Sequence, residues 1–410
     1  MANQVVVEPD LQFTQDLIAA GAGDLKKCFQ CATCSVACRI APDNNPYPRK
    51  EMIWAQWGLK DRLMGDPDVW LCHQCNDCST QCPRGAYPGE VLKAARKMHI
   101  QESAWPSFLG KLVGEPALFV LAIGIPVVLV LLLLFGLNNG LRFPAPKPGE
   151  YLVHYGEFIK YLHIQIFFTA ALAFGVISLL ISLKNYWNKL DAANPALAGG
   201  PRKGFVPSLI ETLADILPHT TFKDCEANNI RYSAHLLTFW GMIGLAITTA
   251  IVAGIVDIPH YILRGPEGIP PSRSGPGAIP IKLLGNVSAV AFLIGMVIMI
   301  VRRFTNPEQA GKSAYFDWFF LFVIFGAGVT GMATELVRFG GAISGAYVLY
   351  MIHLMFVLSL FLYLPFSKFA HIGYRTVAIA WGKSVGRNMT LPAKPNYVPA
   401  PKADTAGEAG

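Results

Sequence analysis

Charged residues are scarce in this sequence. Only 15% of the 410 residues are Asp, Glu, Lys or Arg, and 53% are hydrophobic, whereas soluble globular chains carry about 25% charged residues. The mean hydropathy of +0.39 is typical of a chain with several membrane spans. The composition therefore argues against a soluble protein and for a membrane protein.

Cysteine is almost absent outside one short region. Eight of the nine cysteines lie between Cys28 and Cys82, and only Cys225, expected to be an inert loop thiol, lies elsewhere. This clustering excludes a scattered disulfide framework and indicates metal ligation.

The first residues, MANQVVVEPDLQ, lack the basic start and apolar core of a secretory signal. We therefore expect residues 1–110 in the cytoplasm, where cysteine clusters hold metals rather than disulfides.

The clustered cysteines form two copies of one motif. They read Cys28-x2-Cys31-x2-Cys34-x3-Cys38 and Cys72-x2-Cys75-x2-Cys78-x3-Cys82-Pro83. This is the pattern of two-cluster ferredoxins, in which the fourth cysteine of each motif ligates the other cluster. We expect one [4Fe–4S] cluster on Cys28, Cys31, Cys34 and Cys82, and a second on Cys72, Cys75, Cys78 and Cys38.

Other chemistries fit the cysteine motifs less well. Structural zinc sites use two separated cysteine pairs rather than packed quartets, although a zinc-stabilised membrane scaffold remains an alternative. No Cys-x-x-Cys-His for a c-type haem occurs, and no βαβ pattern surrounds either motif. The 33 residues between Cys38 and Cys72 favour a mainly helical ferredoxin over the compact β form.

Long uncharged runs begin after residue 110. They predict six spanning helices at about 117–137, 159–183, 231–256, 282–301, 316–336 and 341–370, each near the ~20 apolar residues that a span needs. We expect Pro126 and Pro365 to kink their helices. The predicted fold class is all-α: a helical ferredoxin-like domain over 1–110, a six-helix cytochrome b bundle over 111–385 and a disordered tail over 386–410.

Basic residues indicate the topology. The net charge of +7 divides into −1 for residues 1–110 and +8 for the rest, which we interpret as a topology signal rather than nucleic-acid affinity. With the N-terminus inside, the inner segments 184–231, 302–317 and 368–410 hold 15 Lys and Arg, and the outer segments hold 7. The positive-inside rule then predicts that both termini are cytoplasmic. The inner loop is expected to carry an interfacial helix near Phe205–Leu217.

Four histidines fall within or beside the apolar runs: His163, His235, His353 and His371. An ionisable residue at membrane depth is a functional hypothesis by default. The predicted topology pairs His235 with His371 on the cytoplasmic side and His163 with His353 near the outside. Eighteen residues separate His353 from His371, or ~27 Å of continuous helix, so two bis-histidine b haems fit. His154 competes with His163, and His219 and His260 are expected in loops.

One glycine motif is a false signal. Residues 326–331, GAGVTG, match G-x-G-x-x-G but lie inside the predicted fifth span. A dinucleotide site needs a preceding strand, so we expect these glycines to allow close helix or haem packing. The chain therefore has no credible flavin or nicotinamide site of its own.

Two stretches carry a family resemblance. His353-LMFVLSLFLYLPFSKFA-His371 and Arg231-YSA-His235-LLTFWG resemble the cytochrome b subunit of respiratory nitrate reductases. Leu245 stands where that family has a second histidine, so His163 must supply the missing ligand. The cysteine region resembles the small iron–sulfur subunit of heterodisulfide reductase.

The fusion of these two modules resembles the family of C subunits found in the quinone-interacting membrane-bound oxidoreductase complexes of sulfate reducers. That resemblance implies menaquinone as substrate, FAD-binding and iron–sulfur-containing cytoplasmic subunits, and electron exchange with adenylylsulfate reductase. The leading interpretation is an oxidoreductase subunit that transfers electrons. A heterodisulfide- or sulfite-linked menaquinol oxidoreductase is the redox alternative, with its soluble-substrate site on another chain. At the outer side, Glu335 and Asp257 are the candidate proton relay for quinone, near Arg338 and His260.

Overall fold

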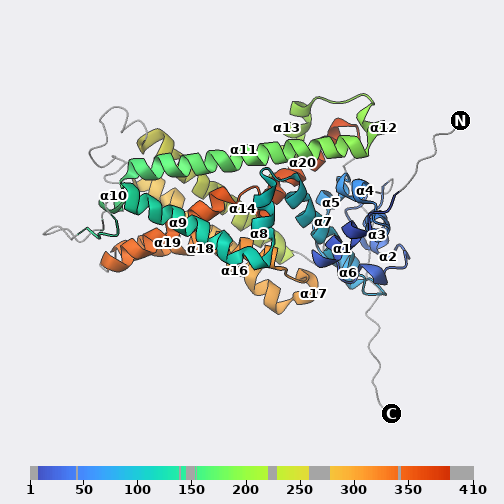
Figure 1. Cartoon of the computed structure of the whole chain (residues 1–410), viewed down its shortest axis with the longest axis horizontal. Helices are drawn as coiled ribbons and strands as arrows, with labels where there is room; N and C mark the ends of the chain where they lie inside the picture. The colour runs from blue at the N-terminus through green and yellow to red at the C-terminus, as the bar shows by residue number, and fades with distance from the viewer. Residues whose placement is uncertain are drawn as a thin grey trace, which may run out of the picture.

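The computed structural model is built from helices. It describes residues 8–42, 45–137, 140–144, 153, 155–219, 229–257, 278–339 and 343–387. Over these ranges the chain forms helices, turns and irregular segments and contains no strand, so the predicted all-α class is confirmed. The described ranges do not include Cys225, His154, His260 or residues 388–410. Figure 1 shows a compact N-terminal domain at one end and the long helices extending away from it.

The N-terminal domain consists of short helices wrapped around one longer helix. They are α1 (Leu11–Ala19), η1 (Leu25–Lys27), α2 (Thr33–Ala37), α3 (Arg49–Gln56), α4 (Lys60–Met64), α5 (Asp68–Leu71), α6 (Asp77–Thr80) and α7 (Pro88–Ser103). α7 begins at Pro88, whose fixed φ suits a first helical position. Fully buried Leu17, Met52 and Val91 belong to one apolar core, which holds the short helices on α7.

Two short elements, α8 (Ser107–Gly114) and η2 (Pro116–Leu118), lead into the long helices. These are α9 (Phe119–Leu137), α11 (Tyr161–Ala193), α14 (Asn229–Ala250) with η5 (Ile251–Asp257), α16 (Ala278–Thr305), α18 (Tyr315–Phe339) and α19 (Ile343–Leu362). All six are long and apolar enough to cross a membrane. The short helices α10 (Tyr155–Phe158), α12 (Pro195–Ala198) and α17 (Pro307–Ala310) lie in the connections. The six predicted spans therefore exist as helices, and the chain is a multi-pass membrane protein.

The last predicted span is not one helix. α19 ends at Leu362, a turn follows, and η7 (Lys368–Ala370) leads into α20 (His371–Ser384). Pro365 has no N–H for a helical hydrogen bond, and its ring clashes with the preceding turn. Helix α19 therefore stops short of the predicted end at residue 370, and His353 and His371 are not joined by the continuous helix that we expected. His371 is instead the first residue of a separate helix.

The second spanning helix continues past its apolar run. α11 extends to Ala193, ten residues beyond the predicted end at Leu183. Its last turns pack against the N-terminal domain: Asn185 donates to the Ser103 carbonyl at 3.2 Å, and Asn194 donates to the Gly65 carbonyl at 3.0 Å. Tyr186, also in this part of α11, is fully buried. The same helix therefore crosses the membrane and supports the N-terminal domain.

α20 forms the other half of this junction. Tyr374 stacks on Trp70 of the N-terminal domain, with ring centres 5.0 Å apart. Beyond the helix, Arg387 donates to both carboxylate oxygens of Asp68 at 2.6 Å. Burying a large aromatic side chain contributes about 1.5–3 kcal/mol, so these contacts hold the domain firmly on the membrane helices.

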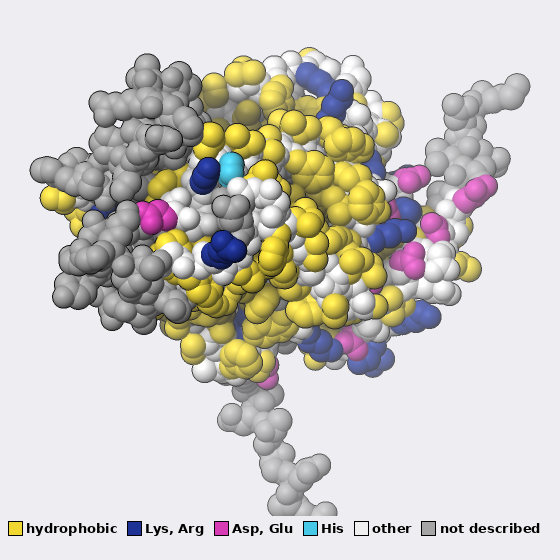
Figure 2. Space-filling model, turned by 60° about the vertical axis from the view of Figure 1, so that its left-hand side comes forward, with side chains coloured by type: hydrophobic (Ala, Val, Ile, Leu, Met, Phe, Trp, Pro, Cys, Tyr) yellow, Lys and Arg dark blue, Asp and Glu magenta, His cyan; other side chains and the backbone are white. Residues whose placement is uncertain are grey.

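The outer surface reflects this division. Figure 2 shows a broad apolar surface over the long helices, with many of the charged side chains gathered at one end. Leu132 and Phe135 of α9 and Ile166 of α11 are more than half exposed, as expected of side chains that face lipid. α13 (Phe205–Ile216) packs on α20 and exposes Phe205, Val206 and Ile210. A helix therefore exists where the sequence predicts an interfacial one.

Candidate electron-transfer site

The first cysteine pocket combines residues that are far apart in the sequence. Cys28, Cys31 and Cys34 of the first motif and Cys82 of the second line one pocket with about 330 Å³ of open space. These are the four thiols that the sequence assigns to one cluster. The structure brings them together, and their ligation of a [4Fe–4S] cluster stays a prediction.

The second cysteine pocket has the complementary set. Cys38 of the first motif joins Cys72, Cys75 and Cys78 around about 340 Å³ of open space. Helices α2 and α6, which begin within the two motifs, pack against each other. This contact brings the fourth cysteine of each motif to the other motif. Four sulfur atoms around each pocket are the donor set that a [4Fe–4S] cluster requires, so the residues present fit two clusters.

The two cysteine loops share an unusual backbone. Gln30 and Ala32 in the first loop have φ values of 67° and 68°, and Gln74 and Asn76 in the second have 54° and 70°. The two pairs occupy equivalent positions between the cysteines. Alternation of left- and right-handed residues turns backbone N–H groups towards one side, which suits an anionic centre. In the second loop the Gln74 N–H donates to Cys72 Sγ at 3.3 Å.

The pockets differ in their exposure to solvent. In the first, Cys31 is exposed and Cys28 and Cys82 are half-buried, whereas three cysteines of the second are buried. Burial, and after it the neighbouring Cys28 and Cys31, raise the pKa of Cys34 to about 12. Burial likewise raises the pKa of Cys38, and a hydrogen bond from Thr33 lowers that of Cys31. Buried thiols of this kind lose their protons when a metal binds.

Two arginines of the membrane helices hold the second cysteine loop. Arg231 of α14 donates to the carbonyls of His73 and Gln74, both at 2.7 Å. Arg375 of α20 donates to the Trp70 carbonyl at 3.2 Å and to His73 Nε2 at 2.8 Å. Burial lowers the pKa of Arg375 to about 10, so the guanidinium stays charged at neutral pH. Burial, and after it Arg375 and Arg231, hold the pKa of His73 well below its usual value.

The same two helices bring two histidines together. His235 follows Arg231 by four residues on α14, and His371 precedes Arg375 by four on α20, so each pair shares a helix face. The rings of His235 and His371 have their centres 6.5 Å apart. Two imidazoles that ligate one metal, with bonds of about 2 Å each, hold their ring centres roughly 6 Å apart. The predicted partners are therefore close enough to ligate one haem iron.

The hydrogen bond of His371 also fits a metal ligand. Its Nδ1 lies 2.7 Å from the Lys368 carbonyl. A carbonyl oxygen only accepts, so Nδ1 carries the proton and Nε2 offers its lone pair. Metal-bound histidines have this arrangement. A b haem held here would supply one-electron oxidation and reduction.

His353 has a similar anchor at a greater distance from the cysteines. Its Nδ1 lies 3.1 Å from the Ala327 carbonyl and 3.2 Å from Thr330 Oγ1, both on α18. A Cβ on Gly331 would lie 2.9 Å from His353 Cε1, so glycine allows the ring this position. His163 is half-buried in the first turn of α11. Its pairing with His353 stays a prediction.

The glycine motif lies inside a helix. All three of its glycines belong to α18, and a Cβ on Gly326 would lie 2.5 Å from the Phe356 ring of α19. Small residues therefore let helices approach closely here. No strand precedes the motif among the residues that the structure describes, and the expected role in packing is confirmed.

Sequence reasoning missed several contributors. His219 lies in a loop, as expected, but it is buried, and its ring centre is 5.0 Å from that of His235. No sequence signal distinguished it. Arg231 and Arg375 were also missed, although their spacing of four residues from His235 and His371 was a usable signal.

Comparisons with known proteins divide the chain in the same way. A family model described as a 4Fe-4S dicluster domain matches residues 24–86. Another model, described as citrate utilization protein B, matches residues 156–388, which is more than half of the chain. The chain belongs to the citrate utilization protein B family. The matched region of this chain contains α11 to α20 and all four candidate haem histidines.

The curated relatives match only the N-terminal region of this chain. The C subunit of the H(2):CoB-CoM heterodisulfide,ferredoxin reductase of Methanothermobacter marburgensis is 39% identical over 88 residues, 21% of this chain and 47% of the relative. A protein of Archaeoglobus profundus, described as similar to the C subunit of heterodisulfide reductase, is 33% identical over 105 residues, 25% of this chain and 56% of the relative.

The chain spans about half the length of these curated relatives. No solved structure matches it. The N-terminal region is therefore similar to C subunits of heterodisulfide reductases and contains a 4Fe-4S dicluster domain, and the six spans follow it in the same chain.

Proposed function

We propose that this chain is the quinone-interacting electron-transfer subunit of a membrane oxidoreductase. It exchanges electrons with menaquinone through two b haems and with cytoplasmic flavoprotein subunits through two [4Fe–4S] clusters. FAD- and iron–sulfur-containing subunits of the same complex are its partners. The complex serves adenylylsulfate reduction in sulfate respiration and exchanges electrons with adenylylsulfate reductase. Both termini lie on the cytoplasmic side of the membrane.

One observation carries the proposal: the second cysteine loop and the His235–His371 pair are held by the same two helices. The arginines that bind the loop lie one turn from the histidines, about 6 Å along each helix axis. Electrons can therefore pass between the membrane and the N-terminal domain without a domain movement. The exposed first pocket supports a role as the exchange point with the soluble partner.

The proposed quinone site lies at the other end of the membrane domain. Quinone chemistry needs an apolar slot, a haem edge and a polar route to water. Glu335 accepts a hydrogen bond from Asn286 of α16 at 3.3 Å, so its carboxylate has a defined position. Asp257 ends the π-helical segment η5, and π-helical turns are frequent at functional sites. In the proposal these two carboxyl groups relay protons.

Two measurements test this function. Visible spectra of the purified full chain should contain b-haem and iron–sulfur absorption, whereas a zinc-stabilised scaffold would absorb in neither band. Haem reduction by a menaquinol analogue should slow at least tenfold in Glu335→Gln or Asp257→Asn, with haem content unchanged. Wild-type rates in both variants would remove the relay and favour a quinone site near His235.

The second candidate is a heterodisulfide- or sulfite-linked menaquinol oxidoreductase. It is favoured by the relatives, which are named as subunits of heterodisulfide reductases. Both candidates use the same centres on this chain and differ in the soluble partner. Identification of the subunits that copurify with the chain separates them.

A further inference from the structure

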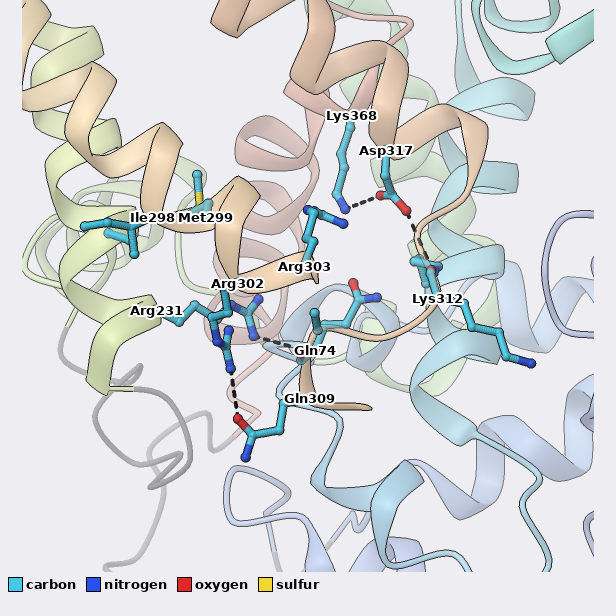
Figure 3. Close-up of a pocket in the computed structure, with 13 residues that line it drawn as sticks. Gln74, Arg231, Ile298, Met299, Arg302, Arg303, Gln309, Lys312, Asp317 and Lys368 are labelled. Atoms are coloured by element: carbon cyan, nitrogen blue, oxygen red, sulfur yellow. Dashed lines mark hydrogen bonds and ion pairs between the residues drawn. The ribbon is translucent and has the colours of Figure 1, made fainter. Parts of the chain in front are cut away.

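A basic pocket lies where the N-terminal domain meets the membrane helices. Figure 3 shows side chains from the second cysteine loop, α14, α16 and α18 around this pocket. Lys93 of α7 also lines it, and the pocket has about 590 Å³ of open space. Gln74 of the cysteine loop forms part of its wall, beside Arg231. The pocket shares Gln74 with the second cysteine pocket, but none of the cysteines and neither His235 nor His371 lines it.

The charged side chains that line the pocket are mostly basic. Its basic residues are Lys93, Arg231, Arg302, Arg303, Lys312 and Lys368, and its one acidic residue is Asp317. Each lysine lies beside a carboxylate: Lys93 pairs with Glu90, Lys312 with Asp24 and Lys368 with Asp317.

The arginines make hydrogen bonds to neutral groups. Arg231 donates to backbone carbonyls, Arg302 donates to Gln309 Oε1 at 3.4 Å, and Arg303 donates to Ser313 Oγ at 2.6 Å. The planar guanidinium matches phosphate oxygens in a bidentate manner. Three arginines that converge on one space therefore favour a phosphate group as the ligand.

The surroundings favour a lipid as the source of that phosphate. Met299 and Ile298 give the pocket an apolar side. On the same end of α16, Val301 is 50% and Phe304 is 69% exposed. Trp318 lies between Phe304, with ring centres 5.6 Å apart, and the guanidinium of Arg303, at 5.9 Å from the ring centre. Aromatic and basic side chains in this arrangement mark a membrane–water interface.

We propose that this pocket binds the phosphate headgroup of an anionic phospholipid on the membrane surface that faces the N-terminal domain. The acyl chains lie along the exposed apolar side of α16. Basic pockets between membrane helices bind such headgroups. Because Arg231 also holds Gln74, the bound lipid strengthens the attachment of the second cysteine loop to the membrane helices.

The test measures lipid binding by the purified full chain. The chain is mixed with equal amounts of phosphatidylglycerol and phosphatidylcholine, and the retained lipids are counted by native mass spectrometry. Hydrogen bonds to charged groups contribute about 1.5–3 kcal/mol, so R302Q/R303Q should lower phosphatidylglycerol retention about tenfold or more. The control K111Q/K184Q removes the same charge from exposed positions outside the pocket and should bind as wild type.

The variant R302K/R303K distinguishes a loss of the binding site from a loss of folding. It keeps the charge but loses the planar fork, so its retention should fall between the other two variants. Equal retention of both lipids by wild type, or equal losses in the pocket and control variants, would overturn the proposal. Full displacement of the lipid by millimolar inorganic phosphate would assign the pocket to a free anion instead. The readout involves no redox centre, so its failure leaves the proposed electron transfer untouched.

Discussion

The two cysteine loops have the same backbone but different surroundings. Both place left-handed residues at equivalent positions, and both exchange their fourth cysteine. The first loop leaves Cys31 exposed near Phe29, which is 58% exposed. The second is covered by α14 and α20 and held by Arg231 and Arg375. A duplicated motif thus provides two similar pockets, one of which is exposed while the other lies against the membrane helices.

The largest expected effect comes from replacing a cysteine that one motif contributes to the pocket of the other motif. Cys82→Ser should disturb the cluster held by Cys28, Cys31 and Cys34, because Cys82 lines their pocket and not the pocket of its sequence neighbours. Cys38→Ser, the matched variant, should disturb the other cluster. Low-temperature electron paramagnetic resonance distinguishes them. Loss of the signal of the second cluster alone in the Cys82 variant would refute the assignment.

The next effect concerns the haem beside the second loop. His371→Ala should abolish the proposed haem on the side of the N-terminal domain and spare the proposed outer one, because a residue that would hold the iron is removed. His163→Ala should do the reverse. Haem content per chain, measured by pyridine haemochrome, should fall by about half in each variant. Full haem content in the His163 variant would make another residue, such as His154, the partner of His353.

A smaller effect should follow from loosening the second loop. Arg375→Gln leaves the Trp70 carbonyl and His73 Nε2 without their charged donor, which costs about 1–3 kcal/mol. The second cluster should change its reduction potential and the first should not. The control is Arg84→Gln, because Arg84 lies beside the exposed first pocket. It should change the reduction potential of the first cluster and not that of the second. Equal shifts of both clusters in the Arg375 variant would contradict this separation.

The smallest effect tests the attachment of the N-terminal domain to α11. Asn194→Ala removes a hydrogen bond to the Gly65 carbonyl and should lower stability by about 1 kcal/mol. Asp10→Ala removes the cap of α1 inside the domain, with a similar cost. Hydrogen exchange should locate the first loss at the junction and the second within α1. Coincident exchange patterns would show that the domain and junction open as one unit.

The sequence predicted what depends on local pattern. Cysteine spacing gave both thiol sets, apolar runs gave the six helices, and charge asymmetry led to the pairing of His235 with His371, which the structure places in contact. The break after Leu362 was only partly foreseen, because Pro365 predicts a kink but not how far the chain departs from the helix. The arginine contacts and the buried place of His219 depend on tertiary packing, which periodicity does not reveal.

The length of α11 sets the distance between its apolar run and the N-terminal domain. The ten residues that follow Leu183 extend about 15 Å beyond the apolar run, at 1.5 Å per residue. The number of residues in the helix therefore determines both a distance and a rotation. Each added residue turns the far end of α11 by about 100° relative to its start. One residue inserted after Lys184 would remove none of the proposed cofactor ligands but would turn Tyr186 and Asn194 away from the domain they support.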